Sequence, residues 1–536
     1  MRLGLTLLAA ASLLAGAASA KAVPSCDVQA LRALPIADLA ITEAVLIAAS
    51  NGQPAHCRVS GTVVTRGDGV GEGLARFSLQ LPETWGRRLL FLGVGGNAGT
   101  LQPSANAVDR ASALLKGYAV IVTDTGHVGD GTTAAWVRKP DGSLDQPKVT
   151  DYLFRAVHSV TVAGKAFAQA YYAVPIQRTY FDGCSTGGRM ALAAAIHYPN
   201  DFSGIIAGDP SLDYNLNIAR MAMQRIVLAK PARYIPPETV VALDKRIVGL
   251  CDAADGAKDG LVQNPAACAV KPEDLACRPG ERAACLKPDQ LFLFRAYLSP
   301  LRDRQGRAIY PGWPIAHLVG SNAVSFYAFG SRAPDIANAE RPWGEDDTKA
   351  PRGFRLGREA LTDWLGYGRD ARIQEADIDP SDKSAGPELM ARTRTVMGEG
   401  ETREAAGLAP YLHGGGKLIL YHGASDPSIP AARTIALYEE LAASYGAEQL
   451  LNGARLFVVP GMHHCSGGPG PDRFDTLTAL EAWVEASQAP VSIRATTAPG
   501  AETAHHIPLC PYPQQARFIG GADLADEKSW RCEARR

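Results

Sequence analysis

The sequence predicts an α/β protein in which a mostly parallel sheet domain is interrupted by a large insertion. Short apolar runs that end in glycine-rich turns recur toward both ends of the chain, and such runs are typical of strands buried on both faces of a parallel sheet. Segments with helical spacing separate these runs, as connections between parallel strands require. The alternation stops in the middle of the chain, where we expect a second domain.

Apolar runs predict the strands of this sheet at residues 88–95, 118–124, 179–183, 204–208, 417–421 and 455–459. Helical patterns lie between or after these strands. They cover residues 159–172, 189–197, 432–445 and 474–486. The alternation of strand and helix predicts an open α/β sheet.

The insertion spans residues 212–410. It contains four of the ten cysteines, many prolines and glycines, and clustered aromatic residues, but no clean series of buried strands. We therefore predict that residues 21–211 and 411–536 form the sheet domain and that the insertion folds as a domain of its own.

Residues 1–20 have the pattern of a secretory signal peptide. A basic start is followed by the apolar run 3–14 and by Ala18-Ser19-Ala20, so cleavage is expected after Ala20. The run is shorter than the ~20 residues that span a bilayer, and no later stretch predicts a transmembrane helix. We expect a secreted or periplasmic protein without a membrane anchor.

The charge balance limits the partners. Lys and Arg number 54 and Asp and Glu 55, which gives a formal net charge of -1. Nucleic acids and anionic membranes require a basic excess, so neither is expected as the main partner. The residues are 46% hydrophobic and 20% charged, a composition typical of a globular protein. These values favour an enzyme with a small-molecule substrate, and nothing in the sequence indicates an oligomeric state.

Ten cysteines in an exported chain predict disulfide bonds. Pairing of nearest neighbours would give Cys26–Cys57, Cys251–Cys268, Cys277–Cys285 and Cys510–Cys532, and would leave Cys184 and Cys465. The counting rule allows on the order of 900 pairings, so the sequence alone leaves the connectivity open.

Gly183-Cys184-Ser185-Thr186-Gly187 fits the G-x-S-x-G pattern of a nucleophile elbow. A predicted strand precedes the pattern and a predicted helix follows it. Such a turn exposes the serine hydroxyl and points a helix N-terminus at a developing oxyanion. Ser185 is therefore the predicted nucleophile. The alternatives are an ordinary strand–helix connection and a Cys184 thiolate, which oxidation in an exported protein disfavours.

A serine nucleophile requires a base and an orienting carboxylate, which in α/β-hydrolases follow it in the order Asp then His. Asp426 follows the predicted strand 417–421, and His464 follows the strand 455–459. Asp209, after the strand 204–208, is the competing acid. Loop histidines other than His464 are interpreted as structural; these are His127, His422 and His463.

The oxyanion hole requires two backbone N–H donors. The elbow predicts that Thr186 supplies one. The glycine-rich loop 93–99 supplies the other through Gly95 or Gly96, of which we favour Gly96. The alternative is that this loop is a turn without a catalytic donor.

Three segments resemble the tannase and feruloyl esterase family of secreted serine esterases. They are Gly183-Cys-Ser-Thr-Gly-Gly-Arg189, Tyr421-His-Gly-Ala-Ser-Asp426 and Pro460-Gly-Met-His-His-Cys-Ser-Gly-Gly468, with Pro508-Leu-Cys-Pro-Tyr-Pro513 as a further match near the C-terminus. The resemblance implies an α/β-hydrolase domain with an inserted lid and a disulfide between Cys184 and Cys465. It supports the five disulfides proposed above.

The segment 251–261 groups three carboxylates and two glycines. Oxygen-rich loops suit a hard cation such as calcium, although the spacing is not that of an EF-hand. The residues alone leave a calcium site and a solvated turn equally open. The family resemblance implies a structural calcium ion with five ligands: the side chains of Asp252, Asp255 and Asp259 and the carbonyls of Ala257 and Leu261.

The lid is expected to supply the acyl pocket. Its aromatic candidates, most of them interpreted as lid core, are Trp313, Phe326, Tyr327, Phe329, Trp343, Phe354, Trp364 and Tyr367. The resemblance also implies that Arg355 meets a substrate carboxylate, as in family members that hydrolyse terephthalate monoesters. Glu359, however, occupies a position where an aromatic wall is expected.

The resemblance implies hydrolysis of esters of aromatic acids, such as feruloyl or galloyl esters. The expected reaction is a two-step acyl transfer through Ser185, with His464 as base, Asp426 as its orienting acid, and the Thr186 and Gly96 N–H groups on the oxyanion. One alternative substrate class is aromatic monoesters like mono(2-hydroxyethyl) terephthalate. An acyltransferase and a non-catalytic secreted binding protein on the same scaffold are further alternatives.

Overall fold

The computed structural model describes most of the chain from residue 25 to residue 534. Outside the described residues lie 1–24, 51, 105–109, 214–229, 303–305, 307, 331–334, 336–342, 345–349, 369–394, 397–404, 502, 521–522, 524–525 and 535–536. The predicted signal peptide therefore falls outside the described part. Within that part, no helix combines the length and the apolar character needed to cross a membrane.

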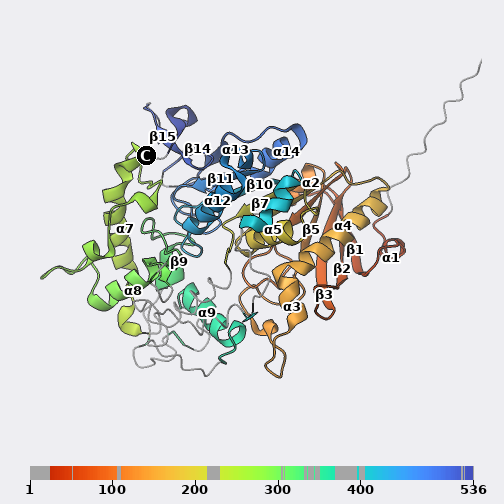
Figure 1. Cartoon of the computed structure of the whole chain (residues 1–536), viewed down its shortest axis with the longest axis horizontal. Coiled ribbons are helices and arrows are strands. Elements are labelled where there is room, and N and C mark those ends of the chain that lie inside the picture. The colour runs from red at the N-terminus through yellow and green to blue at the C-terminus, as the bar shows by residue number, and fades with distance from the viewer. Residues whose placement is uncertain are drawn as a thin grey trace, which may run out of the picture.

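A nine-stranded mixed sheet forms the framework (Figure 1). Its spatial order is β1-β2-β3-β5-β4-β6-β7-β10-β11. The strands are β1 (Leu39–Ile47), β2 (His56–Thr65), β3 (Gly73–Pro82), β4 (Arg88–Leu92), β5 (Tyr118–Thr123), β6 (Arg178–Cys184), β7 (Gly204–Gly208), β10 (Lys417–Gly423) and β11 (Ala454–Val459). The pairs from β1 through β3 to β5 are antiparallel, and all pairs from β5 to β11 are parallel.

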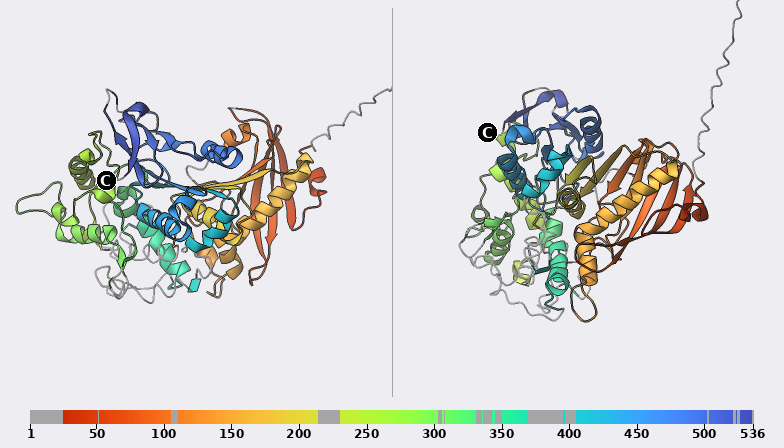
Figure 2. Two further views of the ribbon diagram at one scale, coloured as in Figure 1. Left: turned by 45° about the horizontal axis from the view of Figure 1, so that its top comes forward. Right: turned by 45° about the vertical axis from the view of Figure 1, so that its right-hand side comes forward.

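All six predicted strands are present, as β4, β5, β6, β7, β10 and β11. The four predicted helices are also present, as α4 (Ala156–Tyr172), α5 (Thr186–His197), α12 (Ala431–Tyr445) and α14 (Thr476–Ala486). The antiparallel strands β1, β2 and β3 were not among the predicted elements. They extend the sheet at the edge farthest from the insertion (Figure 2).

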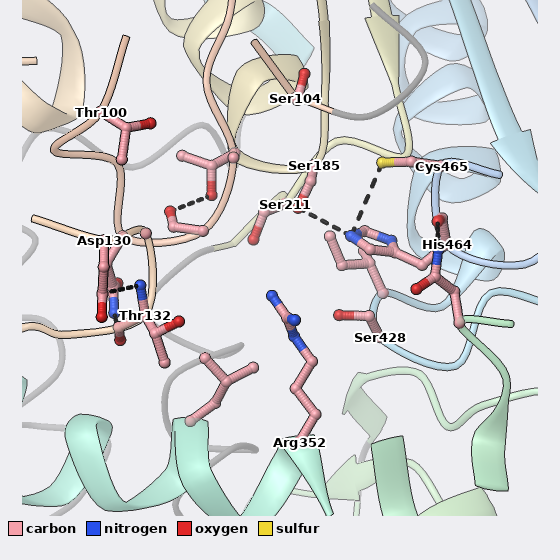
Figure 3. A pocket seen from close by; sticks show the side chains of 18 of the residues that line it. Thr100, Ser104, Asp130, Thr132, Ser185, Ser211, Arg352, Ser428, His464 and Cys465 are labelled. Carbon is pink, nitrogen blue, oxygen red and sulfur yellow. Dashed lines mark hydrogen bonds between the residues drawn. The ribbon is translucent and has the colours of Figure 1, made fainter. Parts of the chain in front are cut away.

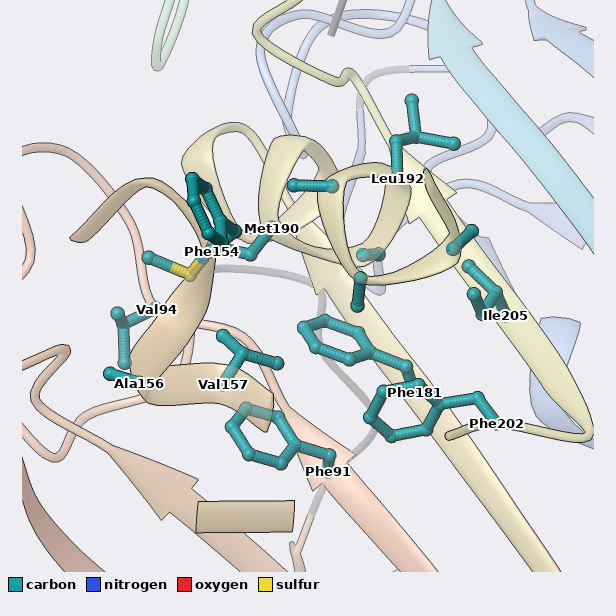
Figure 4. Close-up of a cluster of buried hydrophobic side chains, with 14 of the residues drawn as sticks. Phe91, Val94, Phe154, Ala156, Val157, Phe181, Met190, Leu192, Phe202 and Ile205 are labelled. Carbon is teal, nitrogen blue, oxygen red and sulfur yellow. The ribbon is translucent and has the colours of Figure 1, made fainter. Parts of the chain in front are cut away.

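Both faces of the sheet are covered by helices, so alternate strand residues enter two different cores. In β4, Leu89 and Phe91 belong to the hydrophobic cluster that includes residues of α4, α5 and α12, whereas Leu90 and Leu92 belong to the cluster that includes residues of α14 and of α2 (Arg110–Leu115). Under α5 the rings of Phe91, Phe181 and Phe202 meet, and Phe91 stacks on Phe181 with centroids 4.9 Å apart (Figure 4). This packing explains why the parallel strands are continuously apolar in sequence.

The insertion enters after β7 and returns at β10. It has a hydrophobic cluster of its own, built around α7 (Pro237–Cys251), α8 (Pro288–Leu298) and α9 (Arg352–Glu359). The segment Ala360–Trp364, which continues α9, packs instead into the main core. The insertion therefore touches the sheet domain through the C-terminal end of α9, which lies beside the site described below.

The remaining described elements are short. The helices are α1 (Val28–Arg32), α3 (Gln146–Thr150), α11 (Ala409–His413) and α13 (Ala447–Leu450), and the strands are β8 (Leu301–Arg302), β9 (Ala308–Tyr310), β12 (Arg473–Phe474), β13 (Ile493–Thr496), β14 (His506–Leu509), β15 (Gln514–Phe518) and β16 (Trp530–Ala534). Strands β12 to β14 form a small antiparallel sheet, and β15 pairs with β16.

All ten cysteines form disulfides. Nearest-neighbour pairing is correct for Cys26–Cys57, Cys251–Cys268, Cys277–Cys285 and Cys510–Cys532. The remaining pair, Cys184–Cys465, joins residues 281 positions apart with their Cα atoms at 6.0 Å. Four bridges therefore close local loops, and the fifth connects two distant strand ends.

Candidate active site

Ser185 occupies the tight turn between β6 and α5. Its backbone has φ 62° and ψ −123°, a strained conformation that non-glycine residues rarely adopt. The turn leaves no room for side chains on either side, since a Cβ at Gly183 would lie 2.7 Å from the carbonyl of Gly187. The Ser185 N–H donates to the carbonyl of Gly208 at the end of β7, 2.9 Å away. The turn therefore has the geometry of a nucleophile elbow, with the hydroxyl exposed at its tip.

The structure brings Ser185, His464 and Asp426 together (Figure 3 shows the first two). His464 Nε2 lies 3.0 Å from Ser185 Oγ, and His464 Nδ1 lies 2.7 Å from Asp426 Oδ2. Each residue follows a different strand, and parallel strands end at the same edge of the sheet. A hydroxyl, an imidazole and a carboxylate thus form one hydrogen-bonded chain.

The Asp426 carboxylate is fully buried and saturated with donors. Its Oδ1 accepts hydrogen bonds from the N–H groups of Ser428 at 2.7 Å and Ile429 at 2.9 Å. Burial alone would raise the pKa of Asp426, but the charge of His464 and hydrogen bonds from His422 and His464 outweigh it and hold the pKa well below its usual range. Asp426 is therefore ionised at neutral pH.

Asp209, the competing acid of the sequence analysis, binds backbone groups instead. Its oxygens accept from the N–H groups of Gly423 and Cys465, while the His464 imidazole bonds to Asp426. The geometry thus supports Asp426 as the partner of the imidazole. Cys184, the rival nucleophile, is in a disulfide.

The Cys184–Cys465 disulfide ties the elbow to the histidine loop, because Cys184 precedes Ser185 and Cys465 follows His464. In the chain-entropy model a loop of this length contributes ~5 kcal/mol to stability, and measured values are often smaller. Its position also limits movement of the hydroxyl relative to the imidazole, a geometry to which rates are sensitive.

Gly96 and Thr186, the proposed oxyanion donors, line the same cavity as Ser185. As the first residue of α5, Thr186 has a backbone N–H without an intrahelical acceptor. Gly96 has φ +61°, and a Cβ there would overlap the carbonyl oxygen of Gly131. Only glycine therefore fits at this point of the loop after β4.

The cavity above Ser185 has a volume of about 460 Å³. Many of the residues that line it are polar: Asn97, Thr100, Gln102, Ser104, Asp130, Thr132, Ser211, Asn322 and Ser428. The larger apolar contributors are Tyr327, Leu356, Trp364 and Ile429. The cavity is therefore suited to a ligand with a flat apolar part and several hydrogen-bonding groups.

The arginine in this cavity is Arg352, and Arg355 is absent from its lining. Figure 3 shows Arg352 reaching from its helix toward Ser185, Ser211 and His464. Residues three apart lie almost one turn apart along a helix and differ by about 60° in direction. The helix expected to carry the arginine is therefore at the cavity, where Arg352 lines it in place of Arg355. The arginine directly after Pro351 was the overlooked signal.

The predicted lid aromatics divide into three groups. Tyr327 and Trp364 line the cavity, and Trp364 Nε1 bonds to Asn97 Oδ1 at 3.3 Å. Those buried in the insertion's own core are Trp313, Phe329, Trp343 and Phe354. The other two, Phe326 and Tyr367, lie at the surface and against the main core, respectively. Glu359 is buried and accepts a hydrogen bond from Ala134 N.

The other loop histidines are buried and hydrogen-bonded. His463 links the histidine loop to the insertion, since its ring nitrogens lie 2.8 Å from the carbonyls of Ser321 and His317. His127 Nε2 bonds to the carbonyl of Asn97, and its ring stacks on Trp136. His422 lies between Asp209 and Asp426 and is discussed below.

The segment 251–261 follows α7 and folds as a compact loop. Asp252 Oδ1 accepts from the N–H groups of Asp259 and Gly260. Asp259 Oδ2 is buried and makes no hydrogen bond among the described residues, although His505 Nδ1 lies 3.6 Å away. Burial raises the pKa of this carboxyl to about 6. A buried carboxylate oxygen without a hydrogen bond, beside a second carboxylate, fits a cation site. The side chain of Asp255 lies outside the described part of the loop.

An exposed hydroxyl on a strand–helix elbow, joined to an imidazole at the carboxyl edge of a mostly parallel sheet, is the arrangement of the α/β-hydrolases. Within that class the protein is a carboxylic-ester hydrolase. The chain belongs to the tannase and feruloyl esterase family, whose model matches residues 57–533.

Individual relatives agree with this assignment. The chain is 33% identical to mono(2-hydroxyethyl) terephthalate hydrolase of Piscinibacter sakaiensis, over 90% of this chain and 85% of the relative. It is 30% identical to a probable feruloyl esterase B-2 of Aspergillus flavus, over 78% and 76%. Among solved structures, an esterase from Aspergillus oryzae superimposes with a TM-score of 0.76 at 23% identity, over 93% of this chain and 97% of that chain.

Proposed function

We propose that the protein hydrolyses esters of aromatic acids, of the feruloyl or galloyl type, with Ser185 as the nucleophile. The observation that carries this proposal is the hydrogen-bonded chain from Ser185 through His464 to Asp426, with its 3.0 Å and 2.7 Å contacts. Relatives named feruloyl esterases and the aromatic side chains of Tyr327 and Trp364 in the cavity support the substrate class.

In the proposed mechanism, His464 Nε2 takes the proton of the Ser185 hydroxyl as Ser185 attacks the ester carbonyl. Asp426 keeps His464 in the required tautomer and stabilises the imidazolium that forms. The N–H groups of Thr186 and Gly96 are assigned to the oxyanion. His464 then protonates the leaving alcohol and activates the water that releases the acid and regenerates Ser185.

A second substrate class has an observation of its own in its favour. Arg352 brings a guanidinium into a cavity that also holds the reacting hydroxyl. Guanidinium groups bind carboxylates through paired hydrogen bonds. Aromatic monoesters that carry a free carboxylate, such as mono(2-hydroxyethyl) terephthalate, are therefore the alternative substrates.

We also propose that the loop 251–261 binds a structural calcium ion in the insertion, which would act as a lid over the cavity. Asp252, Asp259 and Asp255, with the carbonyls of Ala257 and Leu261, would hold the ion. The buried oxygen of Asp259, which makes no hydrogen bond among the described residues, supports this proposal. The ion would offset the charge of the loop next to the Cys251–Cys268 disulfide, and the triad chemistry proceeds without it.

Export to the periplasm or the medium is proposed from two observations. Residues 1–20 have the pattern of a signal peptide. All ten cysteines are paired in five disulfides, which form and persist in oxidising compartments.

The experiment compares wild type with Ser185→Ala on methyl ferulate, methyl gallate, chlorogenate and mono(2-hydroxyethyl) terephthalate. We expect wild type to hydrolyse at least one of them and Ser185→Ala to lose at least ~10⁴-fold in kcat while remaining folded. Substantial residual turnover by the variant would exclude the Ser185 mechanism. Adding an excess of a second alcohol separates hydrolysis from acyl transfer, because a transferase would form the new ester.

A further inference from the structure

Asp209 is a fully buried carboxylate next to the proposed triad that the mechanism above does not use. It follows β7, and its N–H donates to the carbonyl of Tyr421 on β10, 2.9 Å away. Its backbone has φ 37°, in the left-handed region where Asp and Asn are tolerated better than most residues. A charged side chain at such a position requires partners that compensate for its burial.

Those partners belong to the two loops that carry the acid and the base. Asp209 Oδ1 accepts from the N–H of Gly423, at the end of β10 and three residues before Asp426, at 2.7 Å. Asp209 Oδ2 accepts from the N–H of Cys465, directly after His464, at 3.0 Å. A single carboxylate thus binds two loops that lie far apart in the sequence.

His422 connects Asp209 to Asp426. Its Nε2 lies 3.4 Å from Asp209 Oδ1, 3.3 Å from Asp426 Oδ2 and 2.9 Å from the carbonyl of Ile429. All three neighbours are acceptors, so Nε2 carries a hydrogen. Without this N–H, two buried carboxylates would face each other, and their repulsion would favour protonation of one of them.

We propose that Asp209 is a positioning residue of this esterase. Its carboxylate holds the Asp426 loop and the His464 loop in register, and together with Asp426 it flanks His422 Nε2. It acts through these groups and does not touch the reacting atoms. The inference rests on the proposed Ser185–His464–Asp426 mechanism.

Asp209, His422 and Asp426 are close enough to one another to share a metal ion. The donors already present argue against that interpretation. Backbone N–H groups occupy both oxygens of Asp209, and the hydrogen on His422 Nε2 points at acceptors. The cluster is therefore satisfied by hydrogen bonds alone.

Burial raises the pKa of Asp209 to about 6, and the charge of His422 offsets part of that rise. Burial lowers the pKa of His422, but the charges of Asp209 and Asp426 outweigh burial and raise it. The titratable groups that face Asp209 from the surrounding elements are His422, Asp426, His464, Tyr421 and Tyr327.

The first test is Asp209→Asn, which keeps the size, one acceptor oxygen and the tolerance of positive φ, but loses one of the two loop hydrogen bonds. We expect kcat to fall ~10–100-fold with KM within about twofold. Burst titration with a p-nitrophenyl ester counts the active sites in each preparation, so that kcat can be expressed per active site. The matched control is Asp244→Asn, a buried aspartate in the insertion that accepts from Leu318 N; we expect its kcat to stay within twofold of wild type.

The second test is His422→Leu, which removes the imidazole N–H that lies between the two carboxylates. One of them should then hold a proton to higher pH, so the acidic limb of the kcat/KM profile should move to higher pH. Adding Asp209→Asn to this variant removes the repulsion. In the His422→Leu background we expect Asp209→Asn to lower kcat by less than about threefold. The acidic limb of the kcat/KM profile should return toward its wild-type position.

The proposal is overturned if Asp209→Asn retains the wild-type kcat per site. It is also overturned if Asp209→Asn lowers kcat by the same factor in the wild-type and His422→Leu backgrounds. If Asp209→Asn does not fold, an unshifted acidic limb in His422→Leu overturns it instead. These outcomes differ from failure of the proposed function, because in that case Ser185→Ala would remain active and no burst would appear in wild type.

Discussion

The side-chain hydroxyl of Thr186 donates a hydrogen bond of 2.7 Å to the carbonyl oxygen of Gly96. The same carbonyl accepts from the Tyr152 hydroxyl at 3.0 Å. Thr186 begins α5, and Gly96 lies on the loop after β4, so the bond connects the two segments assigned to the oxyanion hole. It limits movement between the two backbone N–H groups that the proposed mechanism assigns to one oxyanion.

The first prediction concerns this bond. Thr186→Val keeps the shape of the side chain and the backbone N–H but removes one of the two hydrogen bonds to the Gly96 carbonyl. We expect kcat to fall ~10-fold with KM nearly unchanged, because a misplaced donor weakens binding of the transition state more than of the ester. Thr161→Val is the control, since it removes a buried hydroxyl bond to the carbonyl of Val157 on α4. An equal decrease of kcat in Thr186→Val and Thr161→Val would contradict the assignment of Thr186 and Gly96 to the oxyanion hole.

The second prediction concerns the cavity arginine. Arg352→Gln should lower kcat/KM for monomethyl terephthalate ~10–100-fold, because it removes a charge-assisted contact to the free carboxylate. For the neutral dimethyl ester, kcat/KM of this variant should change by less than about threefold. Arg355→Gln, on the same helix, should leave the ratio of the two substrates unchanged. If the ratio of kcat/KM for the two esters changed in Arg355→Gln and not in Arg352→Gln, Arg355 would be the residue that meets the substrate carboxylate.

The central part of the fold could be predicted from the sequence because its signals are local. Strands such as Gly204–Gly208 are buried along their whole length and read as continuous apolar runs. Ser185, Asp426 and His464 each follow such a strand, and the parallel arrangement then places them at one edge of the sheet. Chain order and strand ends were therefore sufficient to select the three residues that the structure brings together.

Elements that depend on distant partners were missed. Only Ile41 of strand β1 is fully buried, and Thr42 and Glu43 interrupt its apolar residues, so it differs from the strands that are buried along their whole length. The choice between Arg352 and Arg355 depends on which side of α9 faces the cavity, and this is set by packing of the insertion against the sheet domain. Asp209 was correctly located at a strand end, but its bonds to Gly423 and Cys465 follow from tertiary structure alone.

The third prediction concerns the calcium loop. Removal of calcium with EGTA should lower the melting temperature by several degrees, because an ion that binds only the folded state stabilises it. Asp259→Asn should lower it similarly and abolish the effect of EGTA. The control is Asp289→Asn, at an exposed position on α8. At temperatures where the protein remains folded, kcat should not change; a proportional loss of kcat on chelation would instead assign the ion to catalysis.

The fourth prediction concerns His127, which supports the cavity loop through the carbonyl of Asn97. Burial lowers its pKa to about 4, against about 6.5 in the unfolded chain. Between these values the unfolded state binds more protons, so the contribution of His127 is complete above pH 6.5 and is lost as the pH falls toward 4. The loss amounts to about 3 kcal/mol at pH 4.

Several buried carboxylates oppose this trend; burial raises the pKa of Asp209 and of Asp244, for example, to about 6. The measurement is therefore the difference in unfolding free energy between wild type and His127→Gln, followed from pH 8 to pH 4 by urea denaturation. Glutamine can still donate to Asn97 but does not titrate, so the advantage of wild type should shrink by about 3 kcal/mol over this range. His413→Gln, at an exposed position on α11, controls for general effects of removing a histidine. A difference that stays constant with pH would show that His127 does not resist protonation in the folded state.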